Sequence, residues 1–328
     1  MNLIFILLSI IPLLCFSQNF NGPESVEYNS FSDSYFISNS NNGQILELID
    51  NNYTTVFANN LINGPHGLEI IENTLYACSG SRIKGFNIET GEQILNFNIG
   101  GNFLNGITHK IDGSNSLLFI TDFSARKLYE FNINTEEITE LCSFDKNPNG
   151  IIYESNMNRL IIVSWGNNAK IYEFSLNDYS LSTLLTTSLG YLDGISIDQC
   201  GNFIVSSWST NSIHTFRNNF PVNQTNGFNI IASNLSNPAD IFYNQLSNTL
   251  AIPNSGNNTV DFFYYEGDLA GTDTNWPNLD CYSSNIDQLN NESYVLKSIN
   301  ILGQKAKNKG FRIDIFNDGS IKKKYLFK

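Results

Sequence analysis

Short apolar runs, bounded by Asn, Gly and Asp, recur along most of the chain. After Asn149 the sequence reads GIIYE, RLIIVSW, AKIYEFSL and LSTLLTT, which are four candidate strands separated by turn residues. The same order appears in SLLFITDF, RKLYEFNI and EEITELC, and again in GNFIVSSW and SIHTFR. No segment has the long helical periodicity that a helical solenoid requires. The pattern predicts an all-β fold built from four-stranded units.

A three-residue element opens the first strand of each unit: a polar residue, usually a small residue, and then an aliphatic residue. Its six copies end on Val26, Leu68, Ile107, Ile151, Ile195 and Ile241, which are 42, 39, 44, 44 and 46 positions apart. This is the repeat length of propeller blades. The spacing therefore predicts a six-bladed β-propeller, and a short strand at Gln18 to Phe20 is expected to complete the sixth blade.

The two ends of the chain differ from this repeat. Residues 3–14 (LIFILLSIIPLL) are apolar but too short to span a bilayer, and Ser17 suits cleavage before Gln18. Cys15 leaves a lipoprotein as the alternative, although no small residues precede it. The sequence thus predicts a signal peptide (1–17), a propeller (18–266), a linker rich in Gly, Asp, Thr and Asn (267–291) and a small C-terminal β appendage (292–328). No stable membrane insertion is expected.

Charge and cysteines narrow the function classes. The formal charge is −13, but residues 301–328 carry eight Lys or Arg against two Asp, or +6, so the remainder carries −19. Such an acidic body repels phosphate backbones, which argues against nucleic-acid binding. After loss of Cys15, an even set of cysteines remains, and free thiols or one disulfide are expected: Cys78, Cys142, Cys200 and Cys281.

The residue before each inner strand is the candidate site. In a propeller the first strand of each blade lines the central channel, so these residues converge at one mouth. We call them the ring residues: Glu24, His66, Asn105, Asn149, Asp193 and Ala239. Two carboxylates and two amides among them suit calcium, or another divalent cation, better than zinc. The alternative is that Asn-Gly and Asp-Gly are turn dipeptides, but their equivalent positions in different blades favour a metal site.

Four motifs stand at these positions: Glu24 with Tyr28, Asn105-Gly106, Pro148-Asn149-Gly150 and Leu192-Asp193-Gly194. They resemble the regucalcin/gluconolactonase/luciferin-regenerating-enzyme superfamily, and also the paraoxonases and NHL-repeat propellers, over about residues 20–265. The resemblance implies a divalent ion on Glu24, Asn105, Asn149 and Asp193 that activates a water or polarises a lactone carbonyl. Gluconolactonase-like enzymes usually carry an Arg where this chain has Phe103, so specificity for sugar lactones does not follow.

Histidine and aromatic residues are further candidates. Pro65-His66-Gly67 resembles the channel His of paraoxonases and of NHL-type amidating lyases, which implies a base or a metal ligand; a structural role is equally compatible. His109 and His214 are expected to be packing or surface residues. Asp122 is expected to make structural hydrogen bonds to a neighbouring blade, and Trp165 and Trp208 to line either a ligand pocket or the core.

The tail combines ILGQ at 301–304 with a hairpin that ends in DGSIKKK. This combination resembles the C-terminal sorting domain of type IX secretion substrates. It implies recognition by that secretion machinery, transport across the outer membrane, and then release or surface attachment. A solvated β hairpin without a partner is the alternative.

Two functions are compatible with these features. One is a secreted, calcium-dependent hydrolase of a small-molecule lactone or ester, with His66 and Asp193 as catalytic residues. The other is a non-catalytic, NHL-like propeller with a structural calcium that binds an extracellular protein or glycan. The fold alone does not choose between them.

Overall fold

The computed structural model describes residues 20–49, 53–216, 229–265, 295–299, 310–316 and 321–326. The chain divides into two compact units, residues 1–265 and 266–328. The predicted signal peptide and linker lie outside the described residues, as do Cys15 and Cys281. Among the described residues, no helix is long and apolar enough to cross a membrane.

The described part of the first unit forms six antiparallel sheets, so the prediction of an all-β six-bladed propeller is confirmed. Blade one holds β1 (Pro23–Asn29), β2 (Ser34–Asn39), β3 (Gln44–Ile49) and β4 (Tyr53–Ala58). Blade two holds β5 (Leu68–Ile71), β6 (Thr74–Ser79), β7 (Arg82–Asn87) and β8 (Gln93–Asn98). Blade three holds β9 (Leu104–Asp112), β10 (Asn115–Asp122), β11 (Lys127–Asn132) and β12 (Glu137–Ser143).

The remaining blades follow the same order. Blade four holds β13 (Pro148–Glu154), β14 (Arg159–Ser164), β15 (Lys170–Ser175) and β16 (Leu181–Thr186). Blade five holds β17 (Leu192–Ile197), β18 (Phe203–Ser207), β19 (Ser212–Phe216) and β20 (Asn229–Ala232). Blade six has three strands in the described part of the chain: β21 (Phe242–Asn244), β22 (Thr249–Asn254) and β23 (Thr259–Tyr264).

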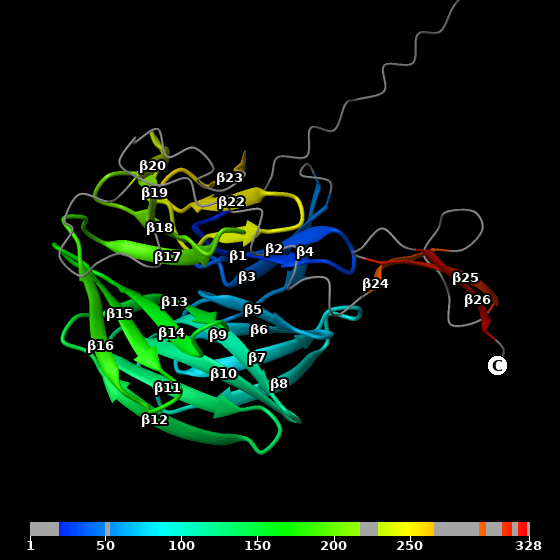
Figure 1. Cartoon of the computed structure of the whole chain (residues 1–328), viewed down its shortest axis with the longest axis horizontal. Helices are drawn as coiled ribbons and strands as arrows, with labels where there is room; N and C mark the ends of the chain where they lie inside the picture. Colours follow the sequence, from blue (N-terminus) through cyan, green and yellow to red (C-terminus); the bar gives the residue numbers. More distant parts are fainter. Residues whose placement is uncertain are drawn as a thin grey trace, which may run out of the picture. The chain divides into compact units, whose positions relative to one another are not determined.

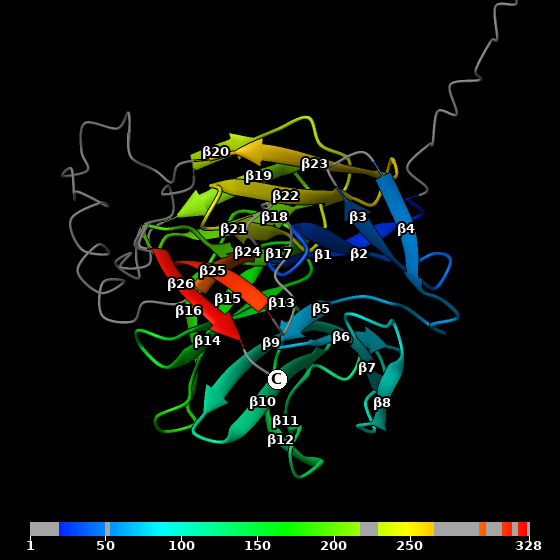
Figure 2. The same cartoon turned by 90° about the vertical axis from the view of Figure 1, so that its right-hand side faces the viewer.

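The blades close into a ring. Each first strand contacts the first strands of both neighbouring blades, and β1 contacts β21. In Figure 1, β1, β5, β9, β13 and β17 lie toward the centre of the ring, whereas β8, β12 and β16 lie at its periphery; Figure 2 gives the view at 90°. Of the strand expected at Gln18 to Phe20, only Phe20 is described. It lies outside any strand, with its side chain buried between blades one and six.

Burial decreases from the axis outward. The second strands β2 and β14 are buried at every position, because neighbouring blades cover both faces. Such strands read as continuous apolar runs, as in RLIIVS. The third strands β3 and β11 alternate, and the fourth strands β8 and β12 are largely exposed.

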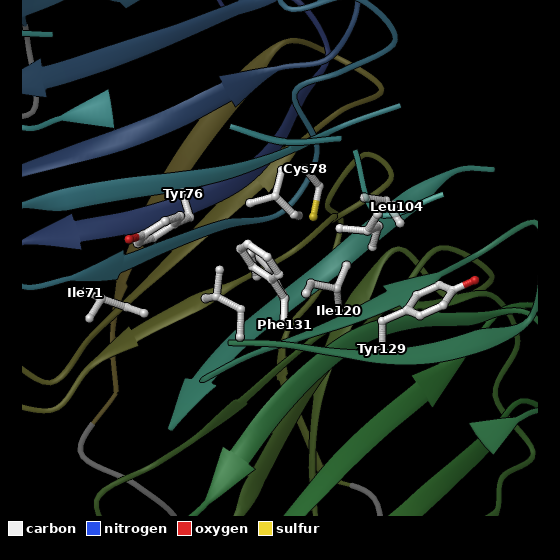
Figure 3. Packing of buried hydrophobic residues seen from close by; sticks show 11 residues of the cluster. Ile71, Tyr76, Cys78, Leu104, Ile120, Tyr129 and Phe131 are labelled. Carbon is white, nitrogen blue, oxygen red and sulfur yellow. The ribbon is translucent and has the colours of Figure 1, made fainter. Parts of the chain in front are cut away.

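The hydrophobic core is divided among the interfaces between blades. Six clusters of buried residues occur, and each joins side chains of two adjacent blades. Figure 3 shows the cluster between blades two and three, where Tyr76 and Cys78 face Leu104, Ile120 and Phe131. The blades are therefore held together by shared apolar surface rather than by separate cores.

The cysteines fall within the predicted alternatives. Cys78 and Cys142 are free thiols, and Cys200 is disulfide-bonded. Burial raises the pKa of the Cys78 thiol, which is an inert core residue.

The second unit contains a three-stranded antiparallel sheet among its described residues. Its strands are β24 (Val295–Ile299), β25 (Gly310–Phe316) and β26 (Ile321–Leu326), in that order. The predicted small β appendage is therefore present, with β25 and β26 paired from Gly310 and Leu326 to Ile315 and Ile321. Its assignment as a sorting domain stays a prediction.

Candidate metal and ligand site

The ring residues lie at one end of the propeller, which we call the mouth end. Glu24, Asn105, Asn149 and Asp193 are the second residues of β1, β9, β13 and β17, and His66 and Ala239 precede β5 and β21. The inner strands run in the same direction, as the parallel bridge between Ser25 and Asp240 shows, so their starting residues share one end. All ring residues are buried except His66, which is half-buried.

A break in the strand ladder occurs at four ring residues. The register between the first and second strands shifts between Pro23 and Val26, and equivalent shifts occur in blades three, four and five. Bulges of this kind re-aim side chains and free the backbone from its own sheet. The freed carbonyls instead accept hydrogen bonds from the preceding blade: Asn105 O accepts from Gly67 N over 2.9 Å, and Glu24 O accepts from Asp240 N over 2.8 Å.

The glycine that follows four of the ring residues is explained by this close approach. A Cβ on Gly106 would lie 2.4 Å from Asn149 O, and one on Gly150 would lie 2.5 Å from Asp193 O. Only glycine leaves room for neighbouring backbones at such distances. The glycines of the repeat therefore bring successive ring residues together; they are not simple turn signals.

Hydroxyl groups of the second strands fix the ring backbone, and the sequence did not reveal them. Thr121 Oγ1 accepts a hydrogen bond from Gly106 N over 2.8 Å and donates to Asn149 O of the next blade over 2.7 Å. Ser206 Oγ does the same with Gly194 N and Ala239 O, both over 2.8 Å. A lone Ser or Thr inside an apolar strand was the available signal.

The hydrogen bonds of Asp122 in the structure differ from those that the sequence predicted. Its carboxylate accepts hydrogen bonds from Asn102 N over 2.6 Å, in the segment before β9, and from Ala125 N over 2.8 Å, in the turn between β10 and β11. The bond to the neighbouring blade comes from Thr121, one residue earlier. Asp122 is nevertheless structural, as expected, because these backbone donors satisfy it in a fully buried position.

Glu24 and Asp193 form an electrostatically unfavourable pair at the mouth end. Burial raises the pKa of Glu24 well above its usual value, and the charges of Asp193 and Asp240 raise it further. Burial and Asp240 also raise the pKa of Asp193, against the lowering effect of the Asn149 and Trp208 side chains. Glu24 Oε2 and Asp193 Oδ1 are buried and accept no hydrogen bond from the described residues. This combination calls for a cation or a proton.

Asp240 is a further acidic residue of the site that sequence reasoning missed. It occupies the position that glycine holds in blades two to five, and its Oδ2 accepts a 2.8 Å hydrogen bond from Ser25 Oγ. Burial raises its pKa to about 7; the hydrogen bond from Ser25 lowers it and the charge of Glu69 raises it. An acid at a position of small residues was the only signal in the sequence.

The acidic lining continues beyond the mouth end. Burial raises the pKa of Glu27, and the charges of Glu69 and Asp240 add to this effect. His109 Nδ1 lies 2.8 Å from Glu69 Oε1, and this contact raises the pKa of His109 although burial opposes it. His109 is thus an ionic link between blades two and three, which the sequence did not predict. His214 is buried against Thr210 Oγ1, at 2.8 Å, as expected for a packing residue.

His66 occupies the mouth end of blade two. Its backbone N donates to Cys78 O over 2.9 Å, and its ring meets Phe103 edge to face, with ring centroids 4.6 Å apart. Burial lowers its pKa to about 4, below the value of about 6.5 that is usual for histidine. The imidazole is therefore neutral at physiological pH. Its Nδ1 is buried and has no hydrogen-bond partner among the described residues.

An arc of half-buried aromatic rings borders the site on blades three to five. We call it the aromatic arc: Phe103, Phe123, Trp165, Tyr191 and Trp208. Its successive rings are in contact, with centroids 5.6 Å apart for Phe103 and Phe123, 6.1 Å for Phe123 and Trp165, 5.0 Å for Trp165 and Tyr191, and 4.9 Å for Trp165 and Trp208. Trp165 and Trp208 thus belong to a partly exposed rim rather than to the closed core.

The arc covers only half of the ring. In each blade the backbone N of one residue after the second strand bonds to the loop before the first strand, which identifies equivalent positions. These positions hold Phe123, Trp165 and Trp208 in blades three to five, but Ser255, Ser40 and Gly80 in blades six, one and two. The mouth end is therefore aromatic on one side and lined with small residues on the other.

The predicted metal ligands meet one test of fit. No three His, Cys, Asp or Glu side chains among the described residues are grouped to hold a metal ion, so the two acids here would need the amides of Asn105 and Asn149. Carboxylate and amide oxygens are the ligand types that calcium takes. The buried, unpartnered oxygens of Glu24 and Asp193 fit such an ion, and the ligand set itself stays a prediction.

Comparisons with known proteins support the fold. No model of a known protein family matches the sequence, and no curated protein matches it. A gluconolactonase from Xanthomonas campestris is similar in structure, with a TM-score of 0.60, 14% identity and coverage of 71% of this chain and 83% of that one. An auxiliary nutrient binding protein from Bacteroides ovatus has a TM-score of 0.59 and 11% identity, covering 74% and 69%. A chain of a nidogen/laminin complex has a TM-score of 0.53 and 16% identity, covering 68% of this chain and 90% of that one. At these identities the likeness establishes the propeller fold alone.

Proposed function

We propose that this propeller is a secreted, calcium-dependent hydrolase of the lactonase or esterase type, with calcium at Glu24, Asn105, Asn149 and Asp193. The pair of buried carboxylate oxygens, Glu24 Oε2 and Asp193 Oδ1, carries the proposal. Two buried carboxylates with raised pKa values, each with one oxygen that accepts no hydrogen bond from the described residues, cost stability unless a cation lies between them. The gluconolactonase among the structural neighbours supports a hydrolytic use of such a site.

Residues of the chain would bind the ion, orient the water and accept the proton in this reaction. When bound, calcium would lower the pKa of a water and polarise an ester or lactone carbonyl. Asp193 would hold the ion and orient that water, and Asn149 is itself oriented, because its Nδ2 donates to Leu192 O over 3.4 Å. His66 is neutral above about pH 4, so it would accept a proton as the free imidazole. The aromatic arc would exclude water from one side of the ligand.

A non-catalytic propeller with a structural calcium is the second candidate. The lowered pKa of His66 favours it, because a histidine with a pKa of about 4 is a weak proton acceptor at neutral pH. In this case the mouth end would bind an extracellular protein or glycan. The nutrient binding protein and the nidogen/laminin complex among the structural neighbours are consistent with a binding role for such a fold.

One experiment separates these proposals. The melting temperature of the purified protein is measured with calcium and with chelator, alongside hydrolysis of a panel of lactones and aryl esters. At a hundredfold excess over its dissociation constant, calcium should add about 2.7 kcal/mol of stability. Asp193→Asn should reduce the shift, and Asp178→Asn, which changes an exposed acid at the opposite end, should not.

The outcomes are distinct. A calcium shift together with chelator-sensitive hydrolysis that His66→Ala abolishes supports the hydrolase. A calcium shift without hydrolysis of any panel member favours the binding protein. An unchanged melting temperature in calcium removes the metal site and with it the hydrolase in this form.

We also propose that the protein is exported and then sorted by its tail. Strand β25 ends before the Asp318-Gly319-Ser320 segment of the predicted sorting motif, and β26 begins directly after it. The type IX secretion machinery would recognise this unit, and the propeller would be released or attached at the cell surface.

A further inference from the structure

Charged residues of the propeller are sorted between its two ends. The turns and strand ends at the mouth end hold five of the eight Lys and Arg in the described part of the propeller: Arg82, Arg126, Lys127, Lys146 and Lys170. The turns and strand ends at the opposite end hold ten acids: Asp33, Glu72, Glu89, Glu92, Asp112, Glu136, Glu137, Glu154, Asp178 and Asp198. An acidic chain therefore presents a basic rim on blades two to four, around an acidic axis.

Three of these basic side chains form no ion pair within the described residues. One is Arg82, which donates to Asn96, and the other two, Arg126 and Lys146, lie close together. Arg126 Nη1 donates to Asp145 O over 3.3 Å, and the next residue, Lys146, donates from Nζ to Asn167 O over 2.7 Å. Both partners are neutral backbone carbonyls. In contrast, Lys127 is paired with Glu140 and Lys170 with Asp145. Neither Arg126 nor Lys146 therefore forms an ion pair within the described residues.

The same loop attaches these charges to the aromatic arc. Asn147, next to Lys146, donates from Nδ2 to Phe123 O over 2.8 Å, and its carbonyl accepts from Trp165 N over 2.8 Å. Arg126 follows Phe123 by three residues in one turn. Two cations and two half-buried rings therefore share one section of the rim, while small residues occupy the other side of the ring.

This arrangement selects a ligand by its polarity. Half-exposed rings of Phe123 and Trp165 offer apolar faces and edges to a planar group. Unpaired guanidinium and ammonium groups form strong, charge-assisted hydrogen bonds with an anion. The side chains of Glu24, Asp193 and Asp240 at the axis offer no positive charge, whereas Arg126 and Lys146 do, so a ligand's negative group would point outward to the rim.

We infer that the mouth end binds an amphipathic organic anion, whose planar apolar group packs on Phe123 and Trp165 and whose anionic group contacts Arg126 and Lys146. This inference rests on the proposed function only in that it names the class of ligand for the same mouth. Binding does not require turnover, so it is tested without hydrolysis and both with and without calcium.

The test uses isothermal titration of the purified protein with three naphthalene probes of similar size. They are the anion naphthalene-2-sulfonate, the neutral naphthalene-2-sulfonamide and the cation 2-naphthylmethylammonium. At low salt the sulfonate should bind about tenfold more tightly than the sulfonamide, and added salt should reduce this preference. The same order is expected in calcium and in chelator, because the rim cations and not the ion select the anion.

Variants assign the preference to the named residues. Arg126→Gln combined with Lys146→Gln should remove the preference for the sulfonate and leave sulfonamide binding unchanged. Lys84→Gln removes one charge from the middle of β7, away from the rim, and should keep the preference. Trp165→Leu should weaken both probes alike, with far-ultraviolet circular dichroism to confirm folding.

Three results would overturn the inference. One is equal or tighter binding of the sulfonamide or the ammonium probe. Another is a sulfonate preference that survives in the double variant. The third is a preference present only with calcium, which would mean that the ion itself binds the sulfonate. If the protein binds the probes as expected but hydrolyses no lactone or ester, the result would instead count against the proposed function alone.

Discussion

Asp240 N donates a 2.8 Å hydrogen bond to Glu24 O, and this bond joins the last blade of the propeller to the first. The neighbouring side chains reinforce it, because Ser25 Oγ donates to Asp240 Oδ2 and accepts from Leu68 N over 3.2 Å. One hydroxyl thus links blades six, one and two. Closure of the ring and the charge state of its acidic lining therefore depend on the same few atoms.

Ser25→Ala should destabilise the ring by about 1–3 kcal/mol, because Asp240 and Leu68 N would each lose a buried partner. Urea denaturation of the full chain measures this loss. Ser180→Ala, which removes an exposed hydroxyl, is the matched control and should change stability by less than about 0.5 kcal/mol. Equal stability of the two variants would contradict the linking role of Ser25.

Gly150→Ala should destabilise the propeller by about 1–3 kcal/mol or prevent its folding, because the new methyl group would lie 2.5 Å from Asp193 O and 2.9 Å from Gly194 Cα. Gly113→Asn is the control, since Gly113 has a φ of +62° that Asn tolerates and no atom lies within 4 Å of its added Cβ. Thermal unfolding of both variants decides the matter. A silent Gly150→Ala would mean that the inner strands do not approach as closely as described.

Asp240 should make the calcium-free protein less stable as the pH rises. Its pKa is about 7 in the folded protein and about 3.9 in an unfolded chain, so the folded state binds the proton more tightly. The stabilisation from this proton is complete below about pH 4 and is lost as the pH rises to about 7. Asp240→Asn should therefore gain stability over the wild type by about 2–4 kcal/mol between pH 5 and pH 8 in chelator. Urea denaturation at both pH values tests this, and a difference that does not depend on pH would refute the shifted pKa.

The three histidines should titrate in a fixed order. Burial lowers the pKa of His66 and of His214 to about 4, whereas Glu69 raises that of His109 above its usual value. NMR spectra of the imidazole protons across pH 3.5–8 should show the His109 resonance titrating at the highest pH and the His66 and His214 resonances titrating near pH 4. Glu69→Gln should lower the pKa of His109 and leave the other two unchanged. A His66 midpoint near 6.5 would restore it as an ordinary base.

The tail should direct export by itself. Fused after a signal peptide and a reporter, residues 280–328 should bring the reporter outside cells that possess type IX secretion. A fusion that lacks residues 310–328, and thus β25 and β26, should leave the reporter in the periplasm. Periplasmic retention of the complete fusion would exclude the sorting role.

Much of the architecture could be read from the sequence, because each strand carries its own turn signals. The predicted segments RLIIVSW and LSTLLTT match β14 and β16 to within one residue at either end. The steps between copies of the repeat gave the blade count and the equivalence of the ring residues. The prediction of a strand at Gln18 to Phe20 had no such support, because three residues carry no alternating pattern. Phe20, the one described residue of the three, lies outside any strand.

The chemistry of the mouth end was harder to predict, because it depends on contacts between blades. In the sequence, Asp240 is a substitution at the position that holds glycine in blades two to five, and Thr121 is an ordinary strand threonine. Their roles arise from contacts with the neighbouring blade: Thr121 bonds to Asn149 O, 28 residues away in sequence, and Asp240 N bonds to Glu24 O of the first blade. The segregation of basic and acidic turns likewise has no signal until strand directions are known.

The division of the core among six interfaces between blades affects how the propeller unfolds. Loss of one blade would bare two clusters at once, so partial unfolding of a single blade is costly and the ring should unfold as one cooperative body. An open repeat array lets its ends fray, but a closed one has no ends. The starting point of the chain is therefore arbitrary for the architecture: a permuted gene beginning at any inter-blade loop encodes the same circle of contacts.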